Sequence, residues 1–472
     1  MGIEADFYKN YKREVNGYEW YVRGGRKKIS ESNVFLRICV FFYYGMKLVL
    51  LLFIAESTTK GGLGLSNGEA TSLLASFMAF SYLSPIVGGW ISDRFLGPKL
   101  CVIIGMIISG CGYFLAFMSH SKQEIQLMIV LCVIGSGLYK STSQTLVGSL
   151  FENDDPRKDG AFSMTYMFTN VGVLLGPFLC GLIANQWFAV KDGGEILEYG
   201  YRAVFLTTAI VIWFGAAFFA IGQKFFLKNM AVSATAKENL KEKKELAKVP
   251  LTTTEKRRMC VILILAFFTI FFWIAYNQAS MSIALYMQNF IDLRIGNFQI
   301  PTAWIDSYNG LLCVILGPIA AAIWVKLSKT RHGDLNISQK MSLGFAFLAV
   351  AFVFMIAAVM KTGEIPGEGA KASVLFIIAF ITFQSIGEMC FAPVGYGMVN
   401  KLAPAKYASL LMGVWFASMF VANKLSGYVE VVIGKLGMLQ VFIIIPGCLL
   451  VIGLLLFALN RKLEKLAQHE RQ

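Results

Sequence analysis

Twelve long apolar runs constrain this chain more than any other feature of its sequence. Each run has about 20 or more residues, which is the length that an α-helix needs to cross a bilayer. Because lipid offers no partner to free backbone polar groups, each run should be helical. The expected spans are 34–57, 69–92, 98–118, 125–151, 160–186, 201–222, 259–289, 306–328, 339–361, 373–400, 406–433 and 438–460. The sequence therefore predicts an all-α polytopic membrane protein with 12 transmembrane helices.

The composition and the positions of the charges agree with this fold class. The chain is 56% apolar and only 15% charged, with a mean hydropathy of +0.60. Its net charge of +14 comes from basic residues near the N-terminus, in the central linker and near the C-terminus. Such clustering is a topology signal, so nucleic acid is not expected as a partner. An even number of helices places both termini on one side, which the basic residues identify as cytoplasmic, in what we expect to be a bacterial inner membrane.

A long polar interruption divides the helices into six and six. We expect a cytoplasmic segment at 1–33, one six-helix bundle at 34–222, a linker at 223–258, a second bundle at 259–460 and a tail at 461–472. Two bundles of this kind rock against each other in transporters, around a substrate site near the middle of the bilayer. The nine cysteines are scattered singly, without metal-binding spacing. No metal site, no cofactor and no enzymatic activity are expected.

Two charged residues lie near the centres of apolar runs, Lys140 in the fourth and Glu388 in the tenth. A charge at that depth costs roughly 2.5–3.5 kcal/mol on insertion scales and usually serves a function. Opposite charges in opposite halves indicate a substrate that carries both signs. A simple pair between Lys140 and Glu388 is the alternative. The turn GGWISDRFLGPK after the second run adds Asp93 and Arg94 as candidate gating residues on the cytoplasmic side, although an ordinary glycine-rich turn also fits.

Several segments resemble the proton-dependent oligopeptide transporter (POT/PTR) family of the major facilitator superfamily. They are FYYGM, SYLSPIVGGWISDRFLG, SMTYMFTNVG, IPTAWIDSYN and, most specifically, the block from Gly387 to Trp415. The resemblance implies a major facilitator fold, and a site in which cations hold a peptide carboxylate while a glutamate holds the amino group. Matched position by position, the implied substrate-binding residues are Tyr43, Tyr44, Lys47, Lys140, Asn170, Trp273, Asn309, Glu388 and Trp415. For the tyrosines and tryptophans, packing in the core is almost as good an explanation.

The chain also departs from the family pattern. Leu36 and Cys39 replace the two glutamates of the first-helix signature, and Asn277 stands where the seventh helix usually has a carboxylate. Arg37 lies almost one helical turn before the position of the usual arginine. Lys424 occupies a position that is more often aromatic, and the sequence does not explain it.

Two titratable candidates for proton coupling remain, Glu388 and Asp306. For Asp306, a solvated carboxylate in the first turn of a helix is the commoner arrangement. We therefore expect an alternating-access transporter of di- and tripeptides, with proton-coupled uptake that is atypical or weakened. The sequence leaves two alternatives open: a facilitator of another small zwitterionic or anionic metabolite, and a substrate sensor that no longer cycles.

Overall fold

The computed structural model describes residues 45–148, 171–192, 195–226, 251–295, 298–330, 335–366, 370–404 and 407–467. Arg37, Tyr43, Tyr44 and Asn170 lie outside the described residues, so their predicted roles stay predictions. Within the described residues, nine helices are long and apolar enough to cross a membrane, and Gly45–Ala55 and Val171–Trp187 are shorter apolar helices. With the 27-residue helix α5, a helix lies in each of the twelve predicted spans.

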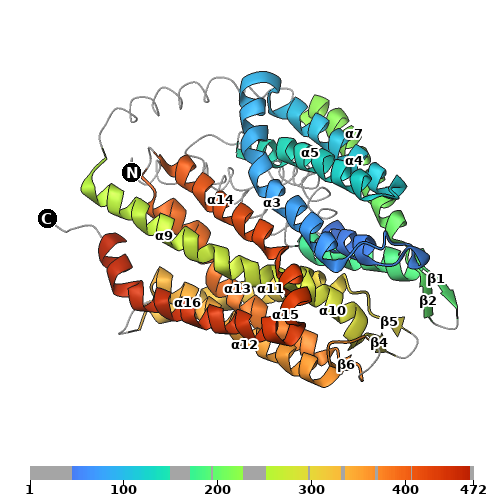
Figure 1. Cartoon of the computed structure of the whole chain (residues 1–472). Helices are drawn as coiled ribbons and strands as arrows, with labels where there is room; N and C mark the ends of the chain where they lie inside the picture. The colour runs from blue at the N-terminus through green and yellow to red at the C-terminus, as the bar shows by residue number, and fades with distance from the viewer. Residues whose placement is uncertain are drawn as a thin grey trace, which may run out of the picture.

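The first half of the chain contributes six of these helices. They are Gly45–Ala55, α3 (Asn67–Ile91) with its π-helical extension η3 (Ser92–Leu96), α4 (Pro98–Met118), α5 (Lys122–Gly148), Val171–Trp187 and α7 (Tyr201–Phe226). Helix α4 packs against α5 and α7, and α3 packs against α5. These helices form the first bundle, drawn from blue to green in Figure 1.

The second half contributes the other six. They are α9 (Thr253–Tyr276) continued by η5 (Asn277–Ser280) and α10 (Ser282–Phe290), then α11 (Trp304–Ser328), α12 (Ile337–Thr362), α13 (Leu375–Leu402), α14 (Ala408–Ser426) continued by α15 (Val429–Leu436), and α16 (Met438–Ala467). Helix α12 packs against α13 and α16, and α9 packs against α14. This second bundle lies beside the first, with α3 and α14 in contact between them (Figure 1).

Short strands mark one end of the molecule, called the strand end below (Figure 1). The pairs are β1 (Val190–Asp192) with β2 (Glu195–Glu198), β3 (Ile291–Asp292) with β6 (Ala372–Ser373), and β4 (Arg294–Ile295) with β5 (Phe298–Gln299). The predicted domain boundaries stay predictions; α7 ends at Phe226 and α9 begins at Thr253.

Local sequence signals decide where several helices begin. Ser66 and Glu69 form a capping box at the start of α3, in which each side chain binds the other residue's backbone N–H. Thr252 and Glu255 do the same for α9. Such boxes satisfy two N–H groups that a helix start would otherwise leave without partners. At the start of α4, Gly97 adopts φ 71° and Pro98 occupies the first turn, which fixes the sharp bend after η3.

Glycine also permits a close helix contact in the first bundle. A Cβ atom added to Gly88 on α3 would lie 2.1 Å from the backbone oxygen of Gly137 on α5. Gly88 belongs to the turn motif that the sequence associated with gating. In the structure this glycine serves helix packing within one bundle, since backbones approach this closely only where a side chain is absent.

Replacing Gly88 by valine is expected to force α3 and α5 apart. Overpacking of a tight contact costs about 1–3 kcal/mol, so the thermal unfolding midpoint of purified protein in detergent should fall. Gly317 on α11 is the matched control, because an added Cβ there meets nothing within 4 Å. An equal loss of stability in Gly88→Val and Gly317→Val would contradict the packing role of Gly88.

The two bundles touch each other extensively at the strand end. Arg294 on β4 forms an ion pair of 3.1 Å with Glu195 on β2. The ring of Trp304 stacks on that of Phe178 at 4.7 Å between centroids, and its indole N–H donates to the Phe178 carbonyl. Gln288 on α10 donates to the carboxylate of Glu56. Since each contact joins the first bundle to the second, the strand end is closed in this structure.

Candidate functional site

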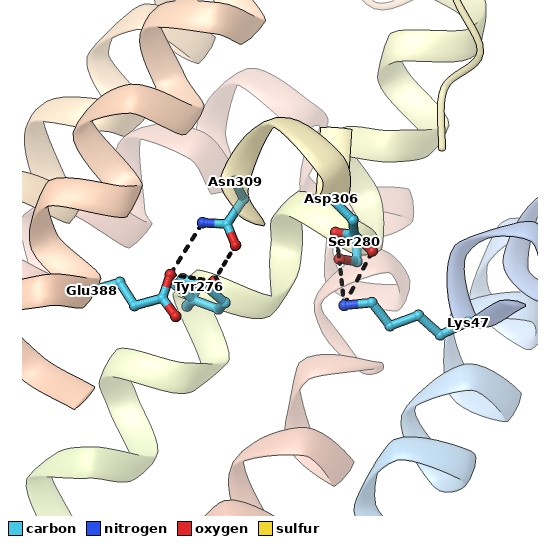
Figure 2. A network of polar contacts seen from close by, with 6 residues as sticks. All are labelled: Lys47, Tyr276, Ser280, Asp306, Asn309 and Glu388. Carbon is cyan, nitrogen blue, oxygen red and sulfur yellow. Dashed lines mark hydrogen bonds and ion pairs between the residues drawn. The ribbon is translucent and has the colours of Figure 1, made fainter. Parts of the chain in front are cut away.

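Glu388 is held in the middle of α13 by three donors from the second bundle. Its Oε2 atom lies 2.7 Å from the hydroxyl of Tyr276, 3.1 Å from Nδ2 of Asn309 and 3.4 Å from Sγ of Cys313. Asn309 Nδ2 also donates to Ser385 Oγ at 2.9 Å, which fixes the orientation of the amide. Figure 2 shows the side chains of Tyr276 and Asn309 pointing toward the Glu388 carboxylate.

The two carboxylate oxygens of Glu388 differ in their hydrogen bonds. Within the described residues, all three hydrogen bonds reach Oε2, and none reaches Oε1. Hydrogen bonds to an ionised acceptor are stronger than those between neutral groups, so the three donors set the direction of the side chain. Tyr82, on α3 of the first bundle, lies within electrostatic range of Glu388. The carboxylate is therefore a rigid anchor beside the boundary between the bundles.

Lys47 forms a second polar cluster, which joins the two bundles. Its Nζ lies 3.2 Å from Oδ2 of Asp306 and 3.3 Å from the hydroxyl of Ser280, and Ser280 donates to Oδ1 of Asp306 at 2.9 Å. The exposed fractions of the two charged side chains are 15% for Lys47 and 11% for Asp306. In Figure 2, Lys47 points from the first bundle toward Asp306 and Ser280. The ion pair is thus enclosed and spans the bundle boundary.

The sequence position of Asp306 favoured a solvated carboxylate, but the side chain is not solvated in the structure. Asp306 does lie in the first turn of α11. The side chain is nevertheless buried, because η5 interrupts the seventh span at the same depth and places Ser280 beside it. The position along the helix was correct, and the expectation of solvent exposure was wrong.

The other predicted site residues are distributed over both bundles. Lys140 lies half-buried on α5. Trp273 is also half-buried, and its ring meets that of Tyr276 edge to face at 4.8 Å. Trp415 is fully buried and packs against Gly395, so in this conformation its ring lies inside the second bundle. Their roles in binding stay predictions.

The candidate gating residues lie on η3, next to the tight turn at Gly97. Arg94 is exposed, and the side chain of Asp93 lies outside what the structure describes. Their gating role therefore stays a prediction.

Two departures from the family pattern acquire partners in the structure. Asn277, the first residue of η5, donates to Asn423 at 3.0 Å and to Ser426 at 3.1 Å, both on α14. Lys424 on α14 donates to Ser76 on α3 at 2.6 Å, across the bundle boundary. Lys424 therefore adds a polar contact between the bundles, which its sequence position alone did not suggest.

Sequence reasoning missed four residues of the two clusters and their surroundings: Tyr82, Tyr276, Ser280 and Cys313. A helical-spacing argument would have found two of them. Tyr276 follows Trp273 by three residues, and Cys313 follows Asn309 by four. Residues three or four apart share one face of a helix. Tyr82 and Ser280 had no such signal, because their neighbours in space belong to other helices.

Two six-helix bundles of apolar helices that enclose an ion pair between them are the architecture of an integral membrane transporter, rather than an enzyme. The model of the POT family matches residues 99–241 and 228–438. The chain belongs to the POT family, and its fold is the major facilitator fold of that family.

Individual relatives agree with this assignment. An uncharacterized transporter of Bacillus subtilis, YclF, is 26% identical, with 90% of this chain and 92% of the relative covered. The dipeptide and tripeptide permease B of Edwardsiella piscicida is 28% identical, with 82% of this chain and 83% of the relative covered. A crystal structure of a peptide transporter POT in complex with sulfate matches with a TM-score of 0.80 at 23% identity, over 94% of this chain and 96% of the other.

Proposed function

We propose that this protein transports di- and tripeptides across the membrane by alternating access. The observation that carries the proposal is the anchored carboxylate of Glu388, with three donors on one oxygen and the other oxygen left to a ligand. A peptide ammonium is a compact cation with three donors, and it suits such an acceptor. An anchor held by its neighbours also lowers the conformational cost of binding.

Lys140 supplies the complementary charge from the first bundle. A short zwitterionic peptide carries a carboxylate at the end opposite its ammonium, and a lysine binds a carboxylate as a point charge. A ligand between Lys140 on α5 and Glu388 on α13 therefore contacts both bundles. Such a ligand couples binding to the relative position of the bundles, which alternating access requires.

The named relatives support a peptide substrate. One is called a peptide transporter in Yersinia enterocolitica, and the relative from Edwardsiella piscicida is called a dipeptide and tripeptide permease. A second class of substrate is supported by another solved relative, a POT family transporter in complex with 5-aminolevulinic acid. Together with the changes at Leu36, Cys39 and Asn277, this keeps a small non-peptide zwitterion as the alternative substrate.

The ion pair of Lys47 with Asp306 is proposed as the gate at the strand end. It exists only while the two bundles meet there, and opening that end separates the charges and hydrates them. Protons enter the cycle through Glu388, which alternates between proton and ammonium, and through Asp306 once Lys47 has moved away. In this arrangement the strand end faces outward, both termini are cytoplasmic, and the host is a bacterial inner membrane.

Uptake of a labelled dipeptide into proteoliposomes tests the proposal. Wild-type protein should take up the dipeptide, and an imposed inward proton gradient should raise accumulation only weakly. In Glu388→Gln, accumulation against a gradient should be lost. Strong uphill accumulation that survives Glu388→Gln would show that coupling does not use this residue. Binding without any uptake would favour a sensor, and uptake of only non-peptide zwitterions would favour the alternative substrate.

A further inference from the structure

A buried glutamate lies at the strand end of the bundle boundary, outside the two clusters described above. Glu430 is in the first turn of α15, and only 8% of its surface is exposed. Its Oε2 atom is fully enclosed and has no hydrogen-bond partner among the residues that the structure describes. Ser282 of α10 and Asn67 of α3 are polar neighbours of the carboxyl. Since α3 belongs to the first bundle and α15 to the second, closure of the strand end encloses Glu430.

The hydrogen bonds around Ser282 indicate which form of Glu430 fits this place. Gln278 Nε2 donates to two backbone carbonyls, those of Ile274 at 2.8 Å and Ser426 at 3.2 Å, so its Oε1 must be an acceptor. Ser282 donates its single hydroxyl proton to that Oε1 at 3.1 Å. Toward Glu430, the Ser282 oxygen therefore offers only lone pairs. A carboxylic acid can donate to them, whereas a carboxylate cannot.

No charge compensates an ionised Glu430 in the part of the chain that the structure describes. No cation and no hydrogen-bond donor of the described residues reaches its enclosed Oε2 atom. The titratable groups on α3, α10, α14, α15 with its N-cap and the first half of α16 are Glu69 with its partner Lys122, Tyr82, Tyr286, Lys424, Tyr428, Lys435 and Cys448, and Glu364 after α12 lies beside Gly437. An enclosed carboxylate without a cation or a full set of donors is unfavourable, and the attraction of a helix N-terminus is small by comparison.

We propose that Glu430 is a proton-binding site that controls closure of the strand end. In the closed state the carboxyl is neutral, donates to Ser282 and accepts from Asn67. When the strand end opens, Asn67 leaves with the first bundle, water reaches Glu430, and the proton departs to the strand side. Proton binding and closure therefore favour each other by the same factor.

The sign of the pH dependence follows from the form of Glu430 in the closed state. The closed state holds Glu430 neutral, so acid favours closure through it. One proton bound only in the closed state changes the ratio of closed to open molecules by up to about tenfold per pH unit. The dependence of the closed fraction on pH therefore reports proton binding by Glu430.

The test measures closure without substrate, and so does not depend on transport. Spin labels on cysteines placed at Glu195 and Arg294, which are in contact across the closed strand end, report its opening by pulsed electron paramagnetic resonance. The background lacks the exposed native cysteines Cys111, Cys260 and Cys448. In reconstituted wild-type protein, the closed fraction should rise as pH falls. In Glu430→Gln, which resembles the neutral acid, closure should predominate and the rise should vanish or reverse.

Two further variants make the outcome specific. Glu69→Gln removes another acid at the same end, one already paired with Lys122 at 2.7 Å, and should keep the wild-type dependence on pH. Ser282→Ala removes the acceptor for the Glu430 carboxylic acid, so the pH at which half of the molecules are closed should fall. This variant tests the site even where Glu430→Gln does not fold. The infrared band of a protonated carboxyl should be present in the closed wild type and absent from Glu430→Gln. An unchanged pH dependence in both Glu430→Gln and Ser282→Ala overturns the proposal.

Discussion

Glu388→Gln should weaken the binding of a dipeptide by about 100-fold, which corresponds to about 2.8 kcal/mol. The substitution keeps the size of the side chain and its contacts with Tyr276, Asn309 and Cys313, but it removes the charge that an ammonium requires. Isothermal titration calorimetry on purified protein measures the change directly. The loss should appear in affinity, with little effect on the thermal unfolding midpoint.

A matched ligand separates loss of the charge contact from general damage. N-acetylation of the dipeptide removes its ammonium, so this ligand should bind wild type and Glu388→Gln with equal, weak affinity. Cys313→Ala serves as the control variant, because it removes only the weakest of the three donors to Oε2. It should change dipeptide affinity less than about tenfold, in line with the small net value of one hydrogen bond. A Glu388→Gln protein that still prefers the free dipeptide over the acetylated one excludes Glu388 as the ammonium anchor.

Asp306→Asn should open the strand end. Removal of one partner from an enclosed ion pair leaves a charge without compensation, at a cost of about 3–5 kcal/mol. Here the cost falls only on the closed state, because Lys47 and Asp306 lie on different bundles. The same spin labels at Glu195 and Arg294 should report a population shifted toward long distances. Exchange of the charges, in Lys47→Asp with Asp306→Lys, should restore part of the closed population.

Lys47 has two proposed roles, as part of the gate and as a ligand for the peptide carboxylate. The two roles predict different results for variants of Lys47 and Asp306. As a gate alone, Lys47→Met combined with Asp306→Leu should return the closed population, because an apolar pair can replace an enclosed ion pair. As a ligand for the peptide carboxylate, Lys47→Met should lower affinity even in that double variant. Affinity retained by the double variant would assign Lys47 to the gate and leave Lys140 as the cation of the substrate site.

Much of the fold could be predicted from hydropathy. Helices lie in each of the twelve predicted spans, and the capping boxes at Ser66 and Thr252 agree with local sequence signals. The breaks inside spans were not predicted: η5 divides the seventh span and a turn separates α14 from α15. Neighbouring helices and side chains satisfy the backbone groups that such breaks free. The polar stretch Asn277–Ser280 is too short to interrupt the apolar character of the whole span, so hydropathy over that length does not reveal the break.

The candidate site was predicted only in part. Charge at membrane depth drew attention to Lys140 and Glu388, and the family resemblance added Lys47 and Asn309. The partners of these residues were missed, since Ser280 lies 233 residues from Lys47 and Tyr276 lies 112 from Glu388. Glu430 was not predicted because, in sequence, it is an ordinary acid near one end of a span. Only burial between two bundles makes it unusual.

By itself, the sequence determined that this protein crosses the membrane as helices, and how many, because the hydrogen bonds of a helix are local and its apolar length can be counted. It also predicted that a few charges are kept inside the bilayer for a function. Which charges meet was decided by the tertiary structure alone. Contacts such as Lys47 with Asp306 depend on the rotation and depth of helices from different bundles, which no spacing along a single helix can specify.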